Sequence, residues 1–313
     1  MGPLGWCIVS AMNGAGKGLV SRVRQGLHHS EVGWRLRNLH PTIENILHPP
    51  RAPQAVIDGL NRDGIAITTV DALGIRDLFE RVSQEVHELE RDALDAIEAA
   101  RGSVEEADVR KTFLYPLLPE RPSLSELPNV SALALNDSVL RIAAAYFGMW
   151  TTLRYFNVWH TLVTRGEPRR SQLWHRDPED RRILKMFVYL SDVDHGAGPL
   201  TYAGGSHSKG DLRQHPEAFR ETGRGALRST DEQMSSIVPR SRWVEATGPR
   251  GTVVFADTRG YHKGGLARTR DRLLFNSLYV SGASNAETWI ASGGSGLEGS
   301  PRQRYACRTI QLK

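Results

Sequence analysis

The chain has 313 residues, of which 40% are hydrophobic and 24% charged, a balance typical of a soluble globular protein with a sizeable core. This composition excludes a disordered, collagen-like or coiled-coil chain, and no apolar run reaches the length of about 18 residues that a membrane span requires. The formal charge is +5, but the basic residues are spread along the chain without a recognisable nucleic-acid-binding pattern, so no nucleic-acid partner is expected.

The first part of the chain carries few signals of order. Gly14 to Gly18 is glycine-rich like a phosphate loop, but Ala11 and Gly18 stand where that motif needs a glycine and a hydroxyl. We therefore expect a flexible N-terminal extension over residues 1–40, followed by one domain over 41–300 and a tail over 301–313. Cys7 and Cys307 form no CxxC pair, which fits a reducing, cytoplasmic compartment.

Helical patterns come next in chain order. Residues 52–62 predict a short helix, and 64–70 predict a strand after a turn at Gly64. From Ile75 to Ala100 apolar residues recur at helical spacing, which predicts one long amphipathic helix. After a proline-rich connection over 116–128, Asn136 can cap a helix that runs to about Phe147.

The second half of the chain is rich in strands separated by glycine and proline turns. The predicted strands cover residues 153–163, 184–190, 200–202, 252–255 and 273–280. Helices first and short strands later indicate an α+β protein with a β-sandwich or barrel core over about 150–282. A polar insertion over 206–243 interrupts the strands; it could be a lid that excludes water or a long surface loop.

The chemistry is suggested by His175 and Asp177. On an extended backbone, residues two apart point to the same face, so this pair can direct an imidazole nitrogen and a carboxylate oxygen at one point. His262, which follows the strand over 252–255, could supply a third ligand. Two histidines and one carboxylate suit non-haem Fe(II), because three coordination positions stay open for cosubstrate and dioxygen.

The residues around these three carry a family resemblance. Four blocks are involved: 172–182 (QLWHRDPEDRR), 184–190 (LKMFVYL), 198–207 (GPLTYAGGSH) and 261–265 (YHKGG). Together they closely resemble the phytanoyl-CoA dioxygenase family of Fe(II)/2-oxoglutarate oxygenases. The resemblance implies a double-stranded β-helix with N-terminal helices packed on it, and iron held by His175, Asp177 and His262. Gly264 departs from several relatives, in which a serine at this position touches the cosubstrate.

A 2-oxoglutarate molecule chelating the iron would bury its 5-carboxylate, which requires a charged, fork-shaped partner. Arg268, Arg270 and Arg272 are the candidates, and only Arg272 opens a predicted strand. In the family the arginine lies ten or eleven positions beyond the distal histidine, which favours Arg272. Lys185 is a second candidate for contacting the cosubstrate, although it could instead face solvent.

These observations predict an enzyme that uses Fe(II), 2-oxoglutarate and dioxygen to hydroxylate a C–H bond of a small molecule, releasing succinate and CO2. Desaturation, epoxidation or cyclisation in natural-product biosynthesis stays open as an alternative outcome. Halogenation is not expected, because halogenating relatives replace the carboxylate that Asp177 supplies here. A non-catalytic barrel that only binds a ligand is the alternative from another class. The oligomeric state is not predicted.

Overall fold

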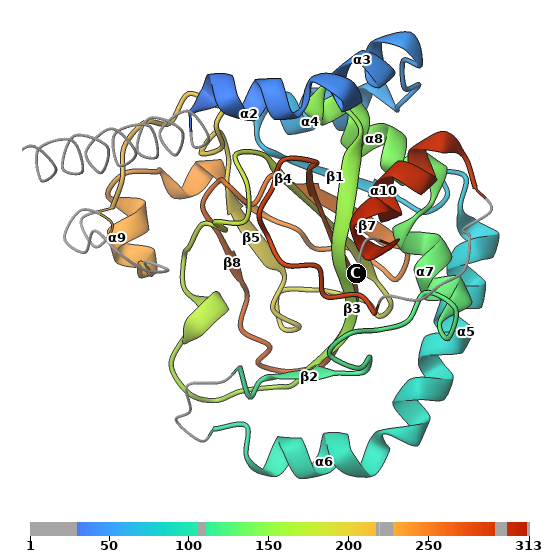
Figure 1. The fold of residues 1–313 in the computed structure, drawn as a ribbon. Helices are drawn as coiled ribbons and strands as arrows, with labels where there is room; N and C mark the ends of the chain where they lie inside the picture. Colours follow the sequence, from blue (N-terminus) through green and yellow to red (C-terminus); the bar gives the residue numbers. More distant parts are fainter. Residues whose placement is uncertain (1–29, 106–110, 217–218, 220–227, 292–298, 312–313) are drawn as a thin grey trace, which may run out of the picture.

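The computed structural model describes residues 30–105, 111–216, 219, 228–291 and 299–311 (Figure 1). The phosphate-loop-like segment and Cys7 lie outside the described residues. Ordered structure begins earlier than the sequence predicts, because α2 (Glu31–Arg37) lies within the expected extension 1–40 and α3 (Leu39–Leu47) begins near its end. Ser30 caps α2 by accepting a hydrogen bond from the backbone N–H of Gly33 at 3.0 Å. The buried Trp34 indole donates to Asp180 at 2.9 Å and so fastens α2 to the rest of the molecule.

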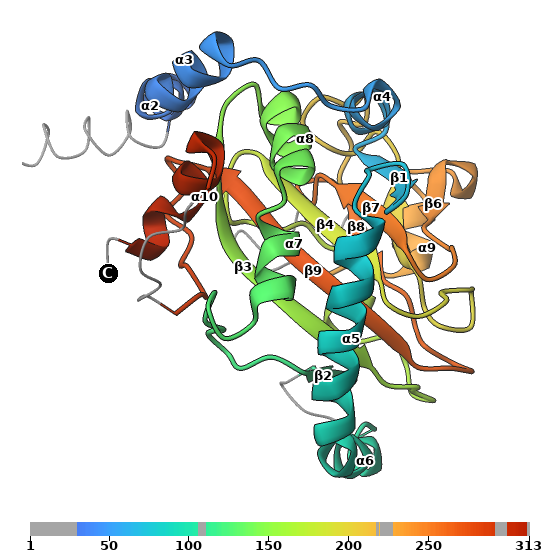
Figure 2. The ribbon, with the colours of Figure 1, turned by 90° about the vertical axis from the view of Figure 1, so that its right-hand side faces the viewer.

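Helices from the N-terminal half cover one face of the larger sheet, as Figure 2 shows for α5, α7 and α8. The helices after α3 are α4 (Gln54–Arg62), α5 (Arg76–Asp92), α6 (Leu94–Gly102), α7 (Pro128–Ala134), α8 (Asp137–Phe147), the short α9 (Asp231–Ser235) in the polar insertion, and α10 (Pro301–Gln311). Asn136 caps α8 as predicted, accepting from the N–H of Ser138 at 2.9 Å. The expected C-terminal tail instead contains α10, which packs against α8 and β3 (Thr151–Thr161).

The long helix predicted from Ile75 to Ala100 is two helices. The chain bends at Ala93, so that α6 runs across the end of α5 (Figure 1). Apolar spacing continues through the bend, with Val86 and Ile97 both buried, which is why periodicity alone did not reveal the break. The bend brings Arg101 of α6 to the edge of the larger sheet.

Two antiparallel sheets form the β part of the molecule. The larger has the order β1-β7-β4-β9-β3-β2 and the smaller β6-β5-β8. Besides β3 the strands are β1 (Ile65–Thr69), β2 (Leu114–Pro116), β4 (Ile183–Tyr189), β5 (Leu200–Ala203), β6 (Trp243–Glu245), β7 (Thr252–Ala256), β8 (His262–Gly264) and β9 (Arg272–Ser281). All six predicted strands are present, and the three that were missed have only three residues each.

The larger sheet separates an apolar core from a polar interior. On β9, Phe275 and Tyr279 join the core under the helices, whereas Leu274 belongs to the cluster between the sheets. This alternation follows from the period of two along a strand. The arrangement confirms an α+β fold built on antiparallel sheets.

One stretch, Pro128–Phe147, is long and apolar enough to cross a membrane by composition. It consists of α7 and α8, and 67% of its most apolar window is buried inside the protein. Val130, Leu133 and Leu140 are among the core residues it contributes. The apolar character of this stretch is therefore that of core helices.

Candidate active site

The structure brings His175, Asp177 and His262 together. His175 and His262 lie opposite each other in a short antiparallel bridge, exchanging backbone hydrogen bonds of 2.9 and 3.0 Å. The backbone N–H of Asp177 donates to the carbonyl of Thr258 at 2.9 Å, which holds its segment beside the same loop. One ligand atom from each of the three buried residues lies within 4.8 Å of the others. Within the described residues, these three form the one such cluster.

Both imidazoles are oriented by their backbone. Nδ1 of His175 lies 2.8 Å from the carbonyl of Leu173, and Nδ1 of His262 lies 3.1 Å from that of Gly260. Each Nδ1 therefore carries the proton and donates it, which leaves Nε2 with a free lone pair. The Nε2 atoms of His175 and His262 lie 3.8 and 3.5 Å from the Asp177 carboxylate. Burial lowers the pKa of His175 to about 2 and also lowers the pKa of His262, so both rings are neutral.

Asp177 is ionised in this setting. Burial by itself would raise the pKa of its carboxyl, but the ammonium of Lys185 outweighs that effect and holds the pKa well below its usual range. The Lys185 Nζ lies 2.7 Å from Oδ2 of Asp177. Asp177 likewise keeps the pKa of the buried Lys185 high. Two neutral imidazoles and one carboxylate make a donor set of the type that binds Fe(II).

A cavity of about 170 Å³ lies beside the three residues, between the two sheets. The larger sheet contributes alternate residues of three strands to its wall, and the smaller sheet contributes Leu200, His262 and Gly264. Besides Leu114 of β2, the residues from the larger sheet are Tyr155, Trp159 and Thr161 of β3, Lys185, Phe187 and Tyr189 of β4, and Arg272, Leu274 and Asn276 of β9. Lys185, Phe187 and Tyr189 therefore share the face of β4 that forms part of this wall.

Arg272 is the buried cation of the cavity, with a residue exposure of 5%. Its guanidinium donates to the carbonyl of Gly198 and reaches Oγ1 of Thr161 at 3.5 Å. Its Nε is buried without a hydrogen-bond partner among the described residues, and no carboxylate of that part of the chain pairs with it. Burial lowers the pKa of Arg272, a cost that an anion in the cavity would offset.

The other two candidate arginines lie elsewhere. Arg268 donates to the carbonyl of Thr164 at 2.9 Å, and the half-exposed Arg270 pairs with Asp194 at 3.0 Å. Neither lines the cavity. Of the three, only Arg272 fits an anion-binding role in this site.

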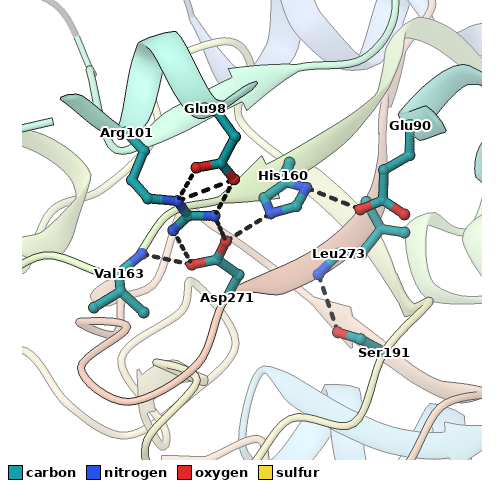
Figure 3. A network of polar contacts seen from close by, with 8 residues as sticks. All are labelled: Glu90, Glu98, Arg101, His160, Val163, Ser191, Asp271 and Leu273. Atoms are coloured by element: carbon teal, nitrogen blue, oxygen red, sulfur yellow. Dashed lines mark hydrogen bonds and ion pairs between the residues drawn. The ribbon is translucent and has the colours of Figure 1, made fainter. Parts of the chain in front are cut away.

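A polar cluster joins the helices to the strand that carries Arg272 (Figure 3). His160 of β3 lies between Glu90 and Asp271, with nitrogen–oxygen distances of 2.9 and 2.8 Å. Asp271 also accepts from both outer nitrogens of Arg101, at 3.1 and 2.6 Å. This cluster could not be predicted from the sequence, because His160 resembles any other strand histidine.

The remaining histidines and tryptophans singled out by the sequence have structural roles. His207 lies 3.2 Å from the carbonyl of Asn61, and the exposed His195 pairs with Glu245. Trp174 is buried and donates to Asp231 at 2.7 Å, whereas Trp159 lines the cavity. Sequence reasoning missed the contributions of Lys111 and Ser171 to the cavity wall. Neither carries a motif that would distinguish it from a surface residue.

Comparison with known proteins gives one family. The family model described as phytanoyl-CoA dioxygenase (PhyH) matches residues 73–272, which is more than half of the chain and includes His175, Asp177, His262 and Arg272. No protein with a curated description matches the sequence significantly.

Among solved structures, the epimerase SnoN in complex with Fe3+, alpha ketoglutarate and nogalamycin RO is similar at 17% identity, with 79% of this chain and 92% of that chain covered and a TM-score of 0.46. HygX from Streptomyces hygroscopicus, with nickel and 2-oxoglutarate bound, is similar at 17% identity, with 80% of this chain and 95% of that chain covered and a TM-score of 0.46. EctD from S. alaskensis, with 2-oxoglutarate and 5-hydroxyectoine, is similar at 17% identity, with 77% of this chain and 86% of that chain covered and a TM-score of 0.47. At these TM-scores nothing about the reaction of this chain follows from them. The family match rests on the sequence, and this chain belongs to the phytanoyl-CoA dioxygenase family of Fe(II)/2-oxoglutarate-dependent oxygenases.

Proposed function

We propose that the protein hydroxylates an unactivated C–H bond of a small-molecule substrate. One dioxygen molecule supplies one oxygen atom to the new hydroxyl group and one to succinate, while 2-oxoglutarate loses CO2. The equation R–H + 2-oxoglutarate + O2 → R–OH + succinate + CO2 balances without another reductant. The observation that carries this proposal is the convergence of His175, Asp177 and His262 on a cavity that is also lined by Arg272, which no carboxylate of the described residues pairs with.

The three converging residues would hold Fe(II). Nε2 of His175, Nε2 of His262 and a carboxylate oxygen of Asp177 are the donors, and the backbone carbonyls of Leu173 and Gly260 fix the imidazole orientations. Bound iron would supply the activation of dioxygen, and 2-oxoglutarate would chelate it. Asp177 occupies a ligand position with a carboxylate, which argues against halogenation.

Arg272 would hold the 5-carboxylate of 2-oxoglutarate. Its fork-shaped guanidinium can donate two parallel hydrogen bonds to a carboxylate, and its bond to Gly198 keeps it directed along the cavity. Lys185 lines the same cavity and pairs with Asp177 in the metal-free protein. We propose that Lys185 also assists the cosubstrate anion once a metal ion takes the Asp177 oxygen. Gly264 offers no hydroxyl for that purpose.

Two antiparallel sheets facing each other across the cavity support a double-stranded β-helix, and the buried free thiol of Cys307 fits a cytoplasmic protein. The insertion over 206–243 stays a prediction with both alternatives, a lid that excludes water or a long surface loop. Desaturation, epoxidation or cyclisation would use the same residues, because they differ from hydroxylation only after hydrogen is removed from the substrate. A non-catalytic binding module is disfavoured, because the three residues of an iron site are all present beside Arg272, which has no carboxylate partner among the described residues.

Anaerobic loading with Fe(II) and 2-oxoglutarate tests the proposal. The wild type should develop the weak visible charge-transfer band of the iron–2-oxoglutarate chelate, and His175→Ala should not. Arg270→Gln is the matched control for Arg272→Gln, because it removes an arginine outside the cavity. We expect the band to need much more 2-oxoglutarate in Arg272→Gln only. Equal bands in the wild type and His175→Ala would refute the iron site, and succinate release in air would separate an oxygenase from a binding module.

A further inference from the structure

A second arginine, Arg228, lies on a segment that pairs with the segment carrying His175. Trp174 and Ser229 form an antiparallel bridge and exchange backbone hydrogen bonds of 3.0 Å in both directions. The next pair in this register is His175 with Arg228. Opposed residues in an antiparallel pair project to the same face, so Arg228 shares the face of His175. His262 is paired with His175 on its other side, and the three residues form one row.

The electrostatics agree with this position. Arg228 lies close enough to Asp177 for that carboxylate to raise its pKa, although burial lowers it by more. Its charge in turn lowers the pKa of His175 and of His262. Arg228 is therefore a near neighbour of the metal site, although it is not one of the proposed ligands.

Arg228 has no acidic partner for its charge in the part of the chain that the structure describes. Its Nη1 is buried without a hydrogen-bond partner there. The one carboxylate that influences its pKa is Asp177, which already pairs with Lys185 at 2.7 Å and belongs to the proposed iron site. A partly buried guanidinium that donates to nothing costs free energy unless a ligand completes it.

A second cation lies nearby. Lys111 lines the cavity, although the residue as a whole is exposed. Burial of its ammonium lowers its pKa, and the charges of Lys185 and Arg228 lower it further. Arg272 and Lys185 are assigned to the cosubstrate and to Asp177. Among the described residues, Lys111 and Arg228 are therefore left without an anion of their own.

We propose, on the basis of the function proposed above, that the substrate carries an oxyanion, a carboxylate or a phosphate, and that Arg228 binds it beside the iron with Lys111 at the entrance. The guanidinium fork matches the oxygen spacing of either group. Binding the anion next to His175 would anchor the substrate close to the reacting centre. The charge would then select among substrates, while the apolar wall around Phe187 and Leu274 accepts the body of the molecule.

The test uses matched probes on the intact enzyme loaded anaerobically with Fe(II) and 2-oxoglutarate. The probes are octanoate, octyl phosphate and octanamide, and 3-phenylpropionate, phenylethyl phosphate and 3-phenylpropionamide. Each is titrated while the change in the charge-transfer band is recorded. We expect an acid or a phosphate to bind at least about tenfold more tightly than its amide, as one charged hydrogen bond implies. Comparing the acids with the phosphates decides between the two anions.

Variants assign the effect to the residue. Arg228→Gln should remove the preference for the anion, Arg228→Lys should keep part of it, and Arg270→Gln should leave it unchanged. Equal binding of acid, phosphate and amide, no binding of any probe, or an intact preference in Arg228→Gln would overturn the proposal. Weakened 2-oxoglutarate binding in Arg228→Gln would overturn it too, because Arg228 would then serve the cosubstrate. A wild type that forms no charge-transfer band would instead refute the proposed function.

Discussion

The cluster around His160 predicts a pH dependence of stability that can be worked out from its contacts. Burial alone would lower the pKa of this imidazole, but hydrogen bonds to Asp271 and Glu90 outweigh it and raise the pKa from 6.5 to about 9. The folded state therefore holds the proton more tightly than the unfolded chain. The stabilisation is complete below pH 6.5 and is lost as the pH rises through 9. The difference of 9 − 6.5 = 2.5 units corresponds to about 3 kcal/mol.

The assay is urea unfolding of the wild type and His160→Gln across pH 6 to 10. Lys209 has the opposite effect on stability in this range. Burial lowers its pKa from 10.5 to about 8, so its contribution to the stability of the folded state rises with pH. The difference between wild type and variant removes that contribution, since Lys209 is present in both. We expect His160→Gln to be about 3 kcal/mol less stable at pH 6.5, with most of the pH-dependent part gone by pH 10. A difference that stays constant across this range would refute the charged state assigned to His160.

Three further predictions concern the cavity. Arg272→Gln should weaken 2-oxoglutarate binding by about 100-fold and Arg272→Lys by less, as measured by titrating the charge-transfer band. The reason is that Gln loses the paired charged hydrogen bonds to the 5-carboxylate, which contribute about 3 kcal/mol. Asp177→Ala should destabilise the metal-free protein by about 3 kcal/mol because Lys185 stays buried and unpaired, and Lys185→Met in the same chain should restore most of this in urea unfolding. Gly264→Ala should melt within a few degrees of the wild type, because its new Cβ meets only the Ser171 carbonyl at 3.5 Å; Gly265→Ala should melt well below it, because the backbone oxygen of Pro199 would lie at 2.5 Å.

The sequence predicted well wherever local pattern and local structure coincide. The long strands alternate or run apolar over many residues, and Asn136 carries a capping signal, so both were found. The metal triad could be proposed because His175 and Asp177 are two residues apart and share a face. The short β2, β6 and β8 were missed, since three residues carry too little periodicity to be recognised. The bend at Ala93 was missed for a related reason: it preserves the apolar spacing on both sides.

Contacts between distant segments are what the sequence could not supply. Nothing near Arg228 marks it, and it reaches the site only because Ser229 pairs with Trp174, more than 50 residues away in the chain. Its place depends on the register of that pairing, and a shift of one residue would turn its side chain to the other face. A charged residue in a polar insertion is ordinarily a surface residue, so composition favoured the wrong environment for it.

Asp271 and Arg272 show how one strand connects the two halves of the molecule. Adjacent residues on an extended backbone project to opposite faces, so Arg272 enters the cavity while Asp271 turns toward α6 and accepts from Arg101 (Figure 3). Thr161 and His160 of β3 lie opposite Arg272 and Leu273, so both strands are held at the end that carries Arg272, the arginine that we propose binds the cosubstrate. An arginine that donates two parallel hydrogen bonds to a carboxylate must keep its orientation, because this bidentate geometry is lost when the guanidinium rotates. The helical layer thus bears on cosubstrate binding through the backbone of β9, without any helix residue having to contact the cosubstrate.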